Sequence, residues 1–346
     1  MALLFKARDR AKLTQQQLAD KLDRPQSFVA KYEGGERRID LVEFMTIARA
    51  LQLDWIAAVQ ELEAEYGPLT SLTATEPPPA LIYGTAWKKE YTVSLVQLAI
   101  EHGFRAIDTA CQPKHYDEAG VGAGIAAALS GGLKRGDLYL QTKFTPLGGQ
   151  DPGHIPYDPA APLAQQVVQS FQASLRNLQT DYLDCLVLHS PLATADQTDT
   201  VWKALEEIVI SGGARRIGIS NCYALDELRA LHASARVKPA IVQNRFHAQT
   251  GYDRDIRAFC KQHGIIYQSF WTLTANAHLL RSATIESLAG KYQRTPAQIL
   301  FRHLTQAGIV PLTGTRSPQH MREDLAIFEF ELADEERALI EELLSS

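Results

Sequence analysis

Eight short apolar runs, separated by stretches with helical periodicity, fill the chain from Ala80 onward. Continuous apolar strands are typical of a parallel sheet whose outer face is covered by helices. Eight such units in about 265 residues match the size and rhythm of a (β/α)8 barrel. An open doubly wound sheet is the alternative that the same alternation allows. The predicted strands are ALIYGTA (80–86), AIDTA (106–110), LYLQTKF (138–144), CLVLHS (185–190), RIGIS (216–220), IVQNRF (241–246), IIYQSF (265–270) and IVPLTG (309–314).

The first 62 residues have only helical signals. Thr14 begins TQQQLADKL with Gln17 three positions later, which fits a capping box, and Leu18 and Leu22 share one helical face. A further helix is expected in RPQSFVAKYEGG, where Pro25 suits the start and the glycine pair suits the end. LVEFMTIARALQL has apolar residues at helical spacing and predicts another helix.

The segment between the two patterns lacks periodicity and is rich in Pro and Thr, so it predicts a linker. We therefore expect a helical domain over residues 1–62, a linker over 63–79 and the barrel over 80–346. The net charge is +2 over residues 1–56 and −7 over the remainder. This weak basic bias permits DNA binding by the first domain without demonstrating it.

The cysteines do not suggest a metal or disulfide framework. Cys111, Cys185, Cys222 and Cys260 are widely spaced and form no CxxC pair, so we expect reduced thiols in a cytoplasmic protein and no bound metal. The start, MALLFKARDRAK, is too charged for a signal peptide, and no run reaches the length of a membrane span.

Four polar residues lie at or just after predicted strand ends, where barrel enzymes place their chemistry. Asp108, Lys143 and His189 end or nearly end the second, third and fourth strands, and Tyr116 follows the second. A tyrosine donates a proton to an alkoxide if a nearby lysine ammonium lowers its pKa. Taken singly, an Asp at a strand end is usually a turn residue, a Lys is usually a surface group, and a His in an apolar run is usually a core residue.

The segments that hold these residues are FRAIDTACQPKHYDEAGVG, LYLQTKF, SLRNLQTDYLDCLVLHSP and RRIGISNC, and together they resemble the aldo-keto reductases. This resemblance runs from about Leu81 to the C-terminus. It implies a (β/α)8 barrel that reduces aldehydes or ketones by hydride transfer from a nicotinamide. It also implies Tyr116 as proton donor, Lys143 as its tuning partner, Asp108 as orienter and His189 as substrate positioner.

The spacing departs from the family pattern at the proton donor. Most members carry the tyrosine about five residues after the aspartate, whereas Tyr116 follows Asp108 by eight. An ungapped count back from Glu118 places His115 at that site instead. We prefer Tyr116, because a phenol is the donor that the chemistry uses, and His115 remains the alternative.

The same resemblance implies a cofactor site. Ser220, Asn221 and Gln243 match groups that hydrogen-bond the nicotinamide carboxamide, and Phe270 matches the aromatic that stacks on its ring. Trp87 matches an aromatic that lines the substrate pocket, whose apolar wall suits hydrophobic carbonyl compounds.

The segment PLTGTRSPQHMREDL resembles the family's phosphate and adenosine segment. NADPH-preferring members frequently carry a lysine near the glycine that corresponds to Gly314, and this lysine is absent here. A 2′-phosphate needs cationic donors. We expect NADPH, with NADH as the alternative. The residues implied here are Gly314, Thr315, Arg316, His320, Glu323 and Asp324.

Residues 5–56 resemble the Cro/C1-type helix-turn-helix family, which implies sequence-specific DNA binding. Such domains usually bind paired half-sites on DNA as dimers, so the resemblance also implies a homodimer. Gln26 and Ser27 would contact base edges or the adjacent phosphates, and Gln15 and Gln16 would contact the DNA backbone. The expected phosphate contacts are Lys31, Arg37 and Arg38. A module that only docks or dimerises is the alternative.

The sequence thus predicts an NAD(P)H-dependent carbonyl reductase fused to a DNA-binding domain. Two alternatives stay open. One is a transcription regulator whose barrel senses a nicotinamide cofactor or a carbonyl ligand with little turnover. The other is a plain reductase with a vestigial helical appendage.

Overall fold

The protein is represented by a computed structural model that describes residues 2–34, 37, 39, 41–54 and 79–344. The chain divides into two compact units, Met1–Glu76 and Pro77–Ser346, which are described separately below. All of the predicted linker 63–79 except Pro79 lies outside the described residues.

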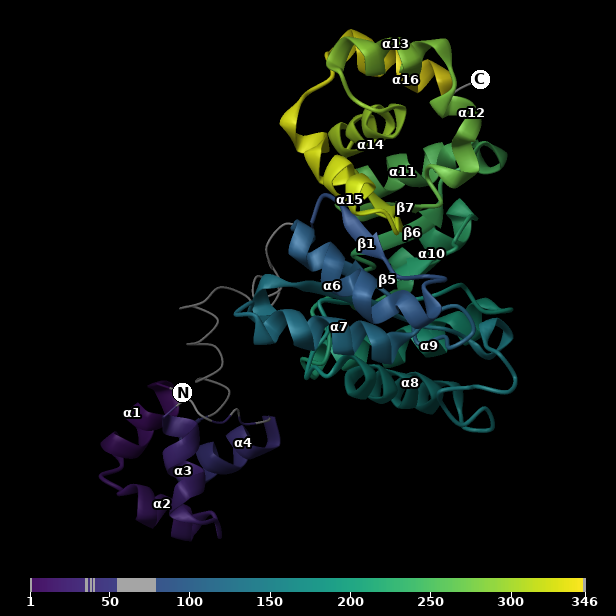
Figure 1. Cartoon of the computed structure of the whole chain (residues 1–346). Helices are drawn as coiled ribbons and strands as arrows, with labels where there is room; N and C mark the ends of the chain where they lie inside the picture. The colour runs from purple at the N-terminus through teal and green to yellow at the C-terminus, as the bar shows by residue number, and fades with distance from the viewer. Residues whose placement is uncertain (1, 35–36, 38, 40, 55–78, 345–346) are drawn as a thin grey trace. The chain divides into compact units, whose positions relative to one another are not determined.

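The second unit is a closed parallel barrel of eight strands (Figure 1). Each strand pairs with the next along the chain, and β8 returns to β1 through the pair Ile82↔Leu312. This closure confirms the predicted barrel and excludes the open doubly wound sheet. The strands are β1 Ile82–Gly84, β2 Ala106–Asp108, β3 Tyr139–Phe144, β4 Cys185–Leu188, β5 Ile217–Ser220, β6 Ile241–Arg245, β7 Ile266–Phe270 and β8 Ile309–Thr313.

Helices surround the barrel and bury their apolar faces on the outer side of the strands. The buried cluster between the two layers includes Val96, Trp202 and Phe301. Gly103 ends α6 in the left-handed region at φ 114°. The helices are α6 Thr92–His102, α7 Glu118–Ser130, α8 Leu163–Leu178, α9 Ala195–Ile210, α10 Leu225–Ser234, α11 Arg254–Gln262, α12 Ala277–Leu280, α13 Ala283–Tyr292, α14 Pro296–Gln306, α15 Pro318–Leu325 and α16 Asp334–Leu343.

Helix α7 packs unusually closely on its neighbour because of one glycine. A Cβ atom on Gly122 would lie 2.0 Å from the carbonyl oxygen of Asn177, near the end of α8. No larger residue fits there without moving backbone. Since α7 begins at Glu118, two residues after Tyr116, this close packing fixes where the loop that carries Tyr116 joins the barrel wall.

The first unit contains the described helices α1 Ala2–Arg10, α2 Gln15–Lys21, α3 Gln26–Glu33 and α4 Leu41–Ala50. The predicted capping box is present, because Thr14 Oγ1 accepts from the Gln17 backbone N–H and Gln17 Oε1 accepts from that of Thr14. The apolar faces of these helices form the core, which includes Leu4 of α1. Its members or packing neighbours include Leu18, Ala19, Leu22, Phe28, Val29, Tyr32, Phe44 and Ile47.

The described helices are all too short or too polar to cross a lipid bilayer. The four cysteines are buried and unpaired. Burial raises the pKa of Cys185 to about 12, so this thiol stays protonated at neutral pH.

Candidate active site

A buried ion pair lies at the carboxyl end of the barrel. The Lys143 ammonium donates to Asp108 Oδ2 over 2.6 Å and to the backbone oxygen of Thr109 over 2.9 Å. Both charged side chains are almost completely buried. Burial lowers the pKa of Lys143, but the carboxylate of Asp108 and then the phenol of Tyr116 more than offset this, so the pKa is raised. Lys143 is therefore charged at neutral pH.

The structure brings Tyr116 and His189 to this ion pair. Lys143 Nζ lies 5.3 Å from the centre of the Tyr116 ring, and the ring centres of Tyr116 and His189 are 6.0 Å apart. Tyr116, His189 and Asp108 all line one cavity of about 990 Å³. The four side chains from separate segments thus converge on one place.

His115, the alternative donor, is turned to a different partner. Its ring stacks on Trp87 with 3.9 Å between ring centres, and its Nδ1 lies 2.9 Å from Gln112 Oε1. His115 also lines the cavity. The contacts with Lys143 and His189 nevertheless belong to Tyr116, which favours the phenol over the imidazole as the group beside the ion pair.

The pKa of Tyr116 differs from the sequence expectation of a lowered value. Burial raises the pKa of the phenol, the Lys143 ammonium lowers it by less, and the Asp108 carboxylate raises it again, so the net direction is upward. The expectation considered the lysine and left out the cost of placing a phenolate in a buried site. The phenol is consequently protonated at neutral pH, which is the state a proton donor needs.

His189 is neutral and is held by a residue that the sequence analysis missed. Burial, with smaller contributions from Lys143 and His115, lowers the pKa of His189 to about 3. Its Nδ1 lies 2.6 Å from Oγ1 of Thr145, the residue directly after β3. A hydroxyl that donates to Nδ1 leaves the proton on Nε2, so Thr145 is placed to select the tautomer. The signal available in the sequence was the position of Thr145, two residues after Lys143.

Beneath the ion pair, three glutamines form a buried hydrogen-bonded layer. Gln141 Nε2 and Gln243 Nε2 donate to Asp108 Oδ1 over 2.7 and 3.0 Å, and both also donate to Gln268 Oε1 over 2.9 Å. These bonds satisfy the second carboxylate oxygen of Asp108. Gln243, predicted to contact the cofactor, is therefore also part of the support of Asp108.

The remaining residues predicted for the nicotinamide end line the same cavity. Ser220 donates to the Gln243 backbone oxygen over 2.7 Å, and Asn221 Nδ2 donates to the His189 backbone oxygen over 2.8 Å. Asn221 has φ 53°, a left-handed conformation in which Asn is favoured. Phe270 ends β7 and is half-buried at the cavity wall.

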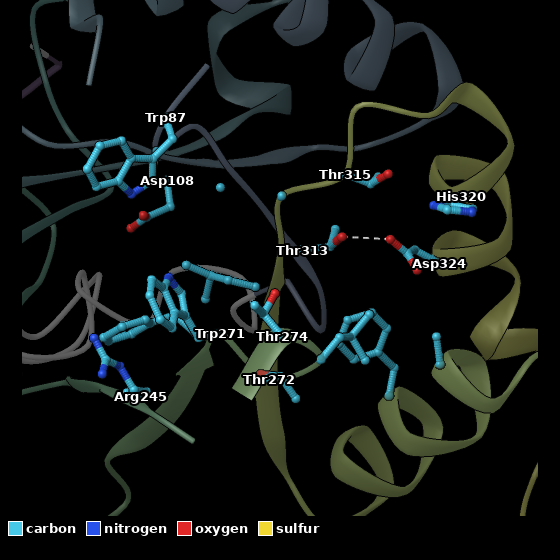
Figure 2. Close-up of a pocket in the computed structure, with 18 of the residues that line it drawn as sticks. Trp87, Asp108, Arg245, Trp271, Thr272, Thr274, Thr313, Thr315, His320 and Asp324 are labelled. Atoms are coloured by element: carbon cyan, nitrogen blue, oxygen red, sulfur yellow. Dashed lines mark hydrogen bonds between the residues drawn. The ribbon is translucent and has the colours of Figure 1, made fainter. Parts of the chain in front are cut away.

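The segment after β8 forms the other end of the cavity, which Gly314, Thr315, His320, Glu323 and Asp324 line (Figure 2). His320 is exposed on α15. Asp324 is buried and accepts from Thr313 Oγ1 over 2.7 Å. Burial, partly opposed by this hydrogen bond, raises the pKa of Asp324 to about 6.

A lysine that sequence reasoning did not single out lies beside this segment. Lys88 is 3% exposed, and its ammonium donates to the backbone oxygen of Gly314. Burial and the nearby Arg316 lower the pKa of Lys88 to about 8. Arg316 itself is exposed and donates to the Trp87 backbone oxygen. A cation thus lies beside the Gly314 segment, which itself contains no lysine.

Trp87, predicted to line the substrate pocket, does line the cavity with 49% of its surface exposed. Two further residues at this end were missed. Arg245, at the end of β6, has its guanidinium carbon 4.3 Å from the centre of the Trp271 ring, and both residues line the cavity. A single arginine at a strand end forms no recognisable sequence motif. Only its position facing the inside of the barrel indicates that Arg245 belongs to the site.

In the first unit, the residues predicted to contact DNA fall into two groups. Gln15 and Gln26 are bonded to each other, and Gln15 also donates to Glu33, which forms a two-point ion pair with Arg8. Arg37 donates to Glu43 over 2.5 Å, and Arg38 lies outside the described residues. The exposed side chains are Gln16, Ser27 and Lys31.

Comparisons with known proteins match both units. The model of the aldo/keto reductase family matches residues 80–345, and a helix-turn-helix model matches residues 4–56. The chain is 31% identical over 248 residues to glyoxal reductase of Bacillus subtilis (strain 168), covering 72% of this chain and 82% of that protein. It is 30% identical over 290 residues to morphine 6-dehydrogenase of Pseudomonas putida, covering 80% and 91% respectively.

Solved structures agree with the barrel. The crystal structure of an aldo/keto reductase from Brucella melitensis has a TM-score of 0.65 and 28% identity, and covers 77% of this chain and 94% of its own. An aldo-keto reductase from a Medee basin deep-sea metagenome library has a TM-score of 0.68 with coverage of 79% and 93%. Its identity of 24% makes that likeness evidence for the fold alone.

Proposed function

The chain belongs to the aldo/keto reductase family of nicotinamide-dependent oxidoreductases, and we propose that its barrel reduces aldehydes or ketones to alcohols with Tyr116 as the proton donor. The observation that carries the proposal is the position of Lys143, which is ion-paired to Asp108 at 2.6 Å and lies 5.3 Å from the Tyr116 ring centre. A buried cation beside a buried phenol stabilises the phenolate that proton donation creates.

In the proposed reaction the carbonyl carbon gains a hydride, which a bound reduced nicotinamide would supply. The carbonyl oxygen gains the electron pair of its broken π bond and takes the phenolic proton of Tyr116. The resulting phenolate is stabilised by the Lys143 ammonium, which Asp108 holds in place, and it regains a proton from water.

His189 would position the carbonyl oxygen. The imidazole is neutral because its pKa is about 3, and a hydrogen bond from Thr145 to Nδ1 would leave an N–H at Nε2 for the substrate. A neutral donor orients the oxygen without adding a second positive charge beside Lys143. This avoids repulsion with the ammonium on which the phenolate depends.

The cavity fits a nicotinamide dinucleotide in volume and in charge. Its volume is about 990 Å³, and a buried ammonium, that of Lys88, faces the Gly314 segment with a carbonyl oxygen as its hydrogen-bond partner. Within the described residues Lys88 makes no ion pair, so a pyrophosphate would supply the charge partner that a buried cation needs. We assign Ser220, Asn221, Gln243 and Phe270 to the nicotinamide end.

We assign the remaining predicted cofactor residues to the phosphate and adenosine end. Gly314, Thr315 and the exposed Arg316 would lie along the phosphates, and His320, Glu323 and Asp324 would face the adenosine. All of these except Arg316 line the cavity. NADPH is the proposed cofactor because Lys88 and Arg316 supply cations. The buried carboxylate of Asp324 opposes a 2′-phosphate, so NADH stays the alternative.

We further propose that the first unit binds DNA. The helix-turn-helix match over residues 4–56 supports this, and Gln16, Ser27 and Lys31 have exposed side chains. Gln16 Nε2 donates to Asp20 Oδ1 over 2.7 Å, so it would exchange this hydrogen bond for one to DNA. Gln15 and Gln26 are bonded to each other, so they would act as one unit. If Lys31 contacts a phosphate, Lys31→Ala should weaken binding and reduce the salt dependence of the affinity by about one counterion. Lys203→Ala, on the exposed face of α9, is the matched control.

The second candidate is a regulator whose barrel senses a cofactor or a carbonyl ligand. The presence of the DNA-binding family in the same chain favours it. The deciding experiment mixes the protein with NADPH and a panel of aldehydes, including 4-nitrobenzaldehyde, and follows NADPH oxidation. Aldehyde-dependent oxidation that Tyr116→Phe abolishes supports the reductase. Tight NADPH binding without turnover on any aldehyde supports the sensor.

A further inference from the structure

Arg245 is a cation at the substrate end of the cavity that the proposed mechanism does not use. It ends β6, two residues after Gln243, and strand alternation turns both side chains toward the inside of the barrel. Gln243 is bonded to Asp108, so Arg245 occupies the next inward position above the layer that supports the ion pair.

The backbone of Arg245 is fixed at this position. Its N–H donates to the Tyr223 hydroxyl over 3.1 Å, and that hydroxyl donates to Asn221 Oδ1 over 3.1 Å. Asn221 in turn is bonded to the backbone of His189. A chain of hydrogen bonds therefore connects the Arg245 backbone to the residue proposed to orient the carbonyl group.

The guanidinium has an aromatic support and lacks a charge partner. Its carbon lies 4.3 Å from the Trp271 ring centre, and its Nε is buried without a hydrogen-bond partner. Across the described part of the chain, the Arg245 side chain makes no ion pair. The carboxylate on the neighbouring segment, Asp253, accepts from Asn244 and Tyr267 instead.

An arginine in this setting is suited to an anionic ligand. A planar guanidinium binds a carboxylate or phosphate through two parallel hydrogen bonds, and an aromatic ring on one face holds its plane without competing for its donors. A partly buried cation with an unpartnered donor gains most from such a ligand, because its desolvation cost is already present in the free protein.

The position of Arg245 in the cavity indicates which molecule carries the anion. Figure 2 shows Arg245 and Trp271 on the side of the cavity where Trp87 and Asp108 lie, whereas Thr315, His320 and Asp324 lie on the other side. Of the cations assigned to the cofactor phosphates, Lys88 donates to the Gly314 backbone oxygen, and Arg316 follows Gly314 by two residues. A second anion, carried by the substrate, fits the end that Arg245 occupies.

We propose that Arg245, supported by Trp271, is an anion subsite that selects carbonyl substrates carrying a carboxylate or phosphate group. This inference rests on the proposed reductase function, of which it specifies the substrate class. The reacting carbonyl lies at Tyr116 and His189, and the anionic end of the same molecule accepts hydrogen bonds from the guanidinium.

The kinetic test compares 4-carboxybenzaldehyde with its neutral counterpart, methyl 4-formylbenzoate. The wild type should favour the carboxylate in kcat/KM by at least about tenfold, the range expected for hydrogen bonds to a charged group. Arg245→Met should bring the ratio of the two values close to one, and Arg245→Lys should leave it in between, because the charge stays and the fork is lost. Arg229→Met, an exposed arginine on α10, should keep the wild-type ratio.

A binding test separates this proposal from the proposed function. The corresponding alcohols, 4-(hydroxymethyl)benzoate and its methyl ester, are titrated calorimetrically into protein saturated with NADPH, where no turnover occurs. If Arg245→Met weakens the binding of 4-(hydroxymethyl)benzoate about tenfold or more and leaves the binding of its methyl ester unchanged, the subsite is supported. This holds even if no aldehyde of the panel is reduced.

The dissociation constant of NADPH for the same variants identifies the source of the anion. If Arg245→Met weakens NADPH binding about tenfold or more and leaves the substrate ratio unchanged, the guanidinium serves the cofactor phosphates and the substrate proposal is overturned. It is equally overturned if neither the ratio nor the selectivity between the two alcohols changes. An unaltered NADPH affinity with a collapsed ratio is the expected result.

Discussion

Lys143 and Asp108 form an ion pair of 2.6 Å in which both side chains are almost completely removed from solvent. The carboxylate is satisfied on both oxygens, by the ammonium on one side and by Gln141 and Gln243 on the other. Because every charge is compensated, the pair holds a fixed cation next to Tyr116. The geometry therefore links the stability of the barrel to the chemistry proposed for its carboxyl end.

Asp108→Asn should destabilise the protein by about 3–5 kcal/mol, because it leaves a buried ammonium without its countercharge. Urea unfolding of the barrel transition measures this. The double variant Asp108→Asn with Lys143→Met removes both charges and should lose less than the sum of the two single variants. Strict additivity of the three free-energy changes would contradict a direct interaction between the two groups.

Tyr116→Phe should lower kcat for aldehyde reduction by roughly 10²–10⁴-fold, because the phenolic proton is lost while the ring remains. His115→Phe is the matched comparison and should lower kcat far less, since His115 contacts Trp87 and Gln112 and not the ion pair. Steady-state kinetics, with NADPH affinity measured by fluorescence, separates the two. The reverse order of effects would transfer the donor role to His115.

The pH profile of kcat/KM should lack an acid limb near the ordinary pKa of histidine. Burial lowers the pKa of His189 to about 3, so its imidazole is already neutral above that pH and gains no proton as the pH falls from 8 to about 5.5. Thr145→Val should lower kcat/KM about tenfold without creating an acid limb. Thr145→Ser should keep kcat/KM close to the wild-type value, because serine retains the hydroxyl. An acid limb near 6.5 that His189→Gln removes would show that the imidazole titrates in the working enzyme.

Much of this architecture follows from patterns within short segments. The eight strands were predicted because each apolar run is local, and the barrel followed from their number and spacing. In the first unit, helical periodicity placed Leu18 and Leu22 on one helical face, and Leu18 is in the core with Leu22 packed against it. Tyr116 was harder, because an ungapped count back from Glu118 pointed one residue earlier. The contacts with Lys143 and His189 distinguish Tyr116 from His115 only in three dimensions.

The residues that were missed meet their partners only through the closed barrel. Lys88 and Gly314 are 226 positions apart in sequence, yet β1 pairs with β8, so the loops that follow these strands are neighbours. Because the sequence predicted a closed barrel, it could also have indicated that Lys88, which follows the first strand, lies near Gly314, which follows the last. Arg245 has no such signal, because its lack of an ion pair depends on where Asp253 and Trp271 lie.

Asp324→Asn should shift the cofactor preference toward NADPH. The carboxylate has a pKa of about 6, so at pH 7.5 it is mostly ionised and repels a 2′-phosphate, whereas Asn retains the size and the hydrogen bond with Thr313. The ratio of the dissociation constants of NADH and NADPH, from fluorescence titrations at fixed ionic strength, should rise about fivefold or more. An unchanged ratio would place the 2′-phosphate away from Asp324.

Lys88→Met should weaken NADPH and NADH by similar factors, roughly tenfold or more, because the ammonium is assigned to the pyrophosphate that both cofactors share. Methionine keeps the length of the buried stem, so a thermal melt of the free protein is expected to show little loss of stability and thereby separates binding from folding.

The pKa of Lys88 is about 8 because the ammonium is buried and close to Arg316. Affinity for both cofactors should consequently fall as the pH rises through about 8 in the wild type and stay flat in the variant. If Lys88→Met weakens NADPH alone, the ammonium contacts the 2′-phosphate and the assignment to the pyrophosphate is wrong.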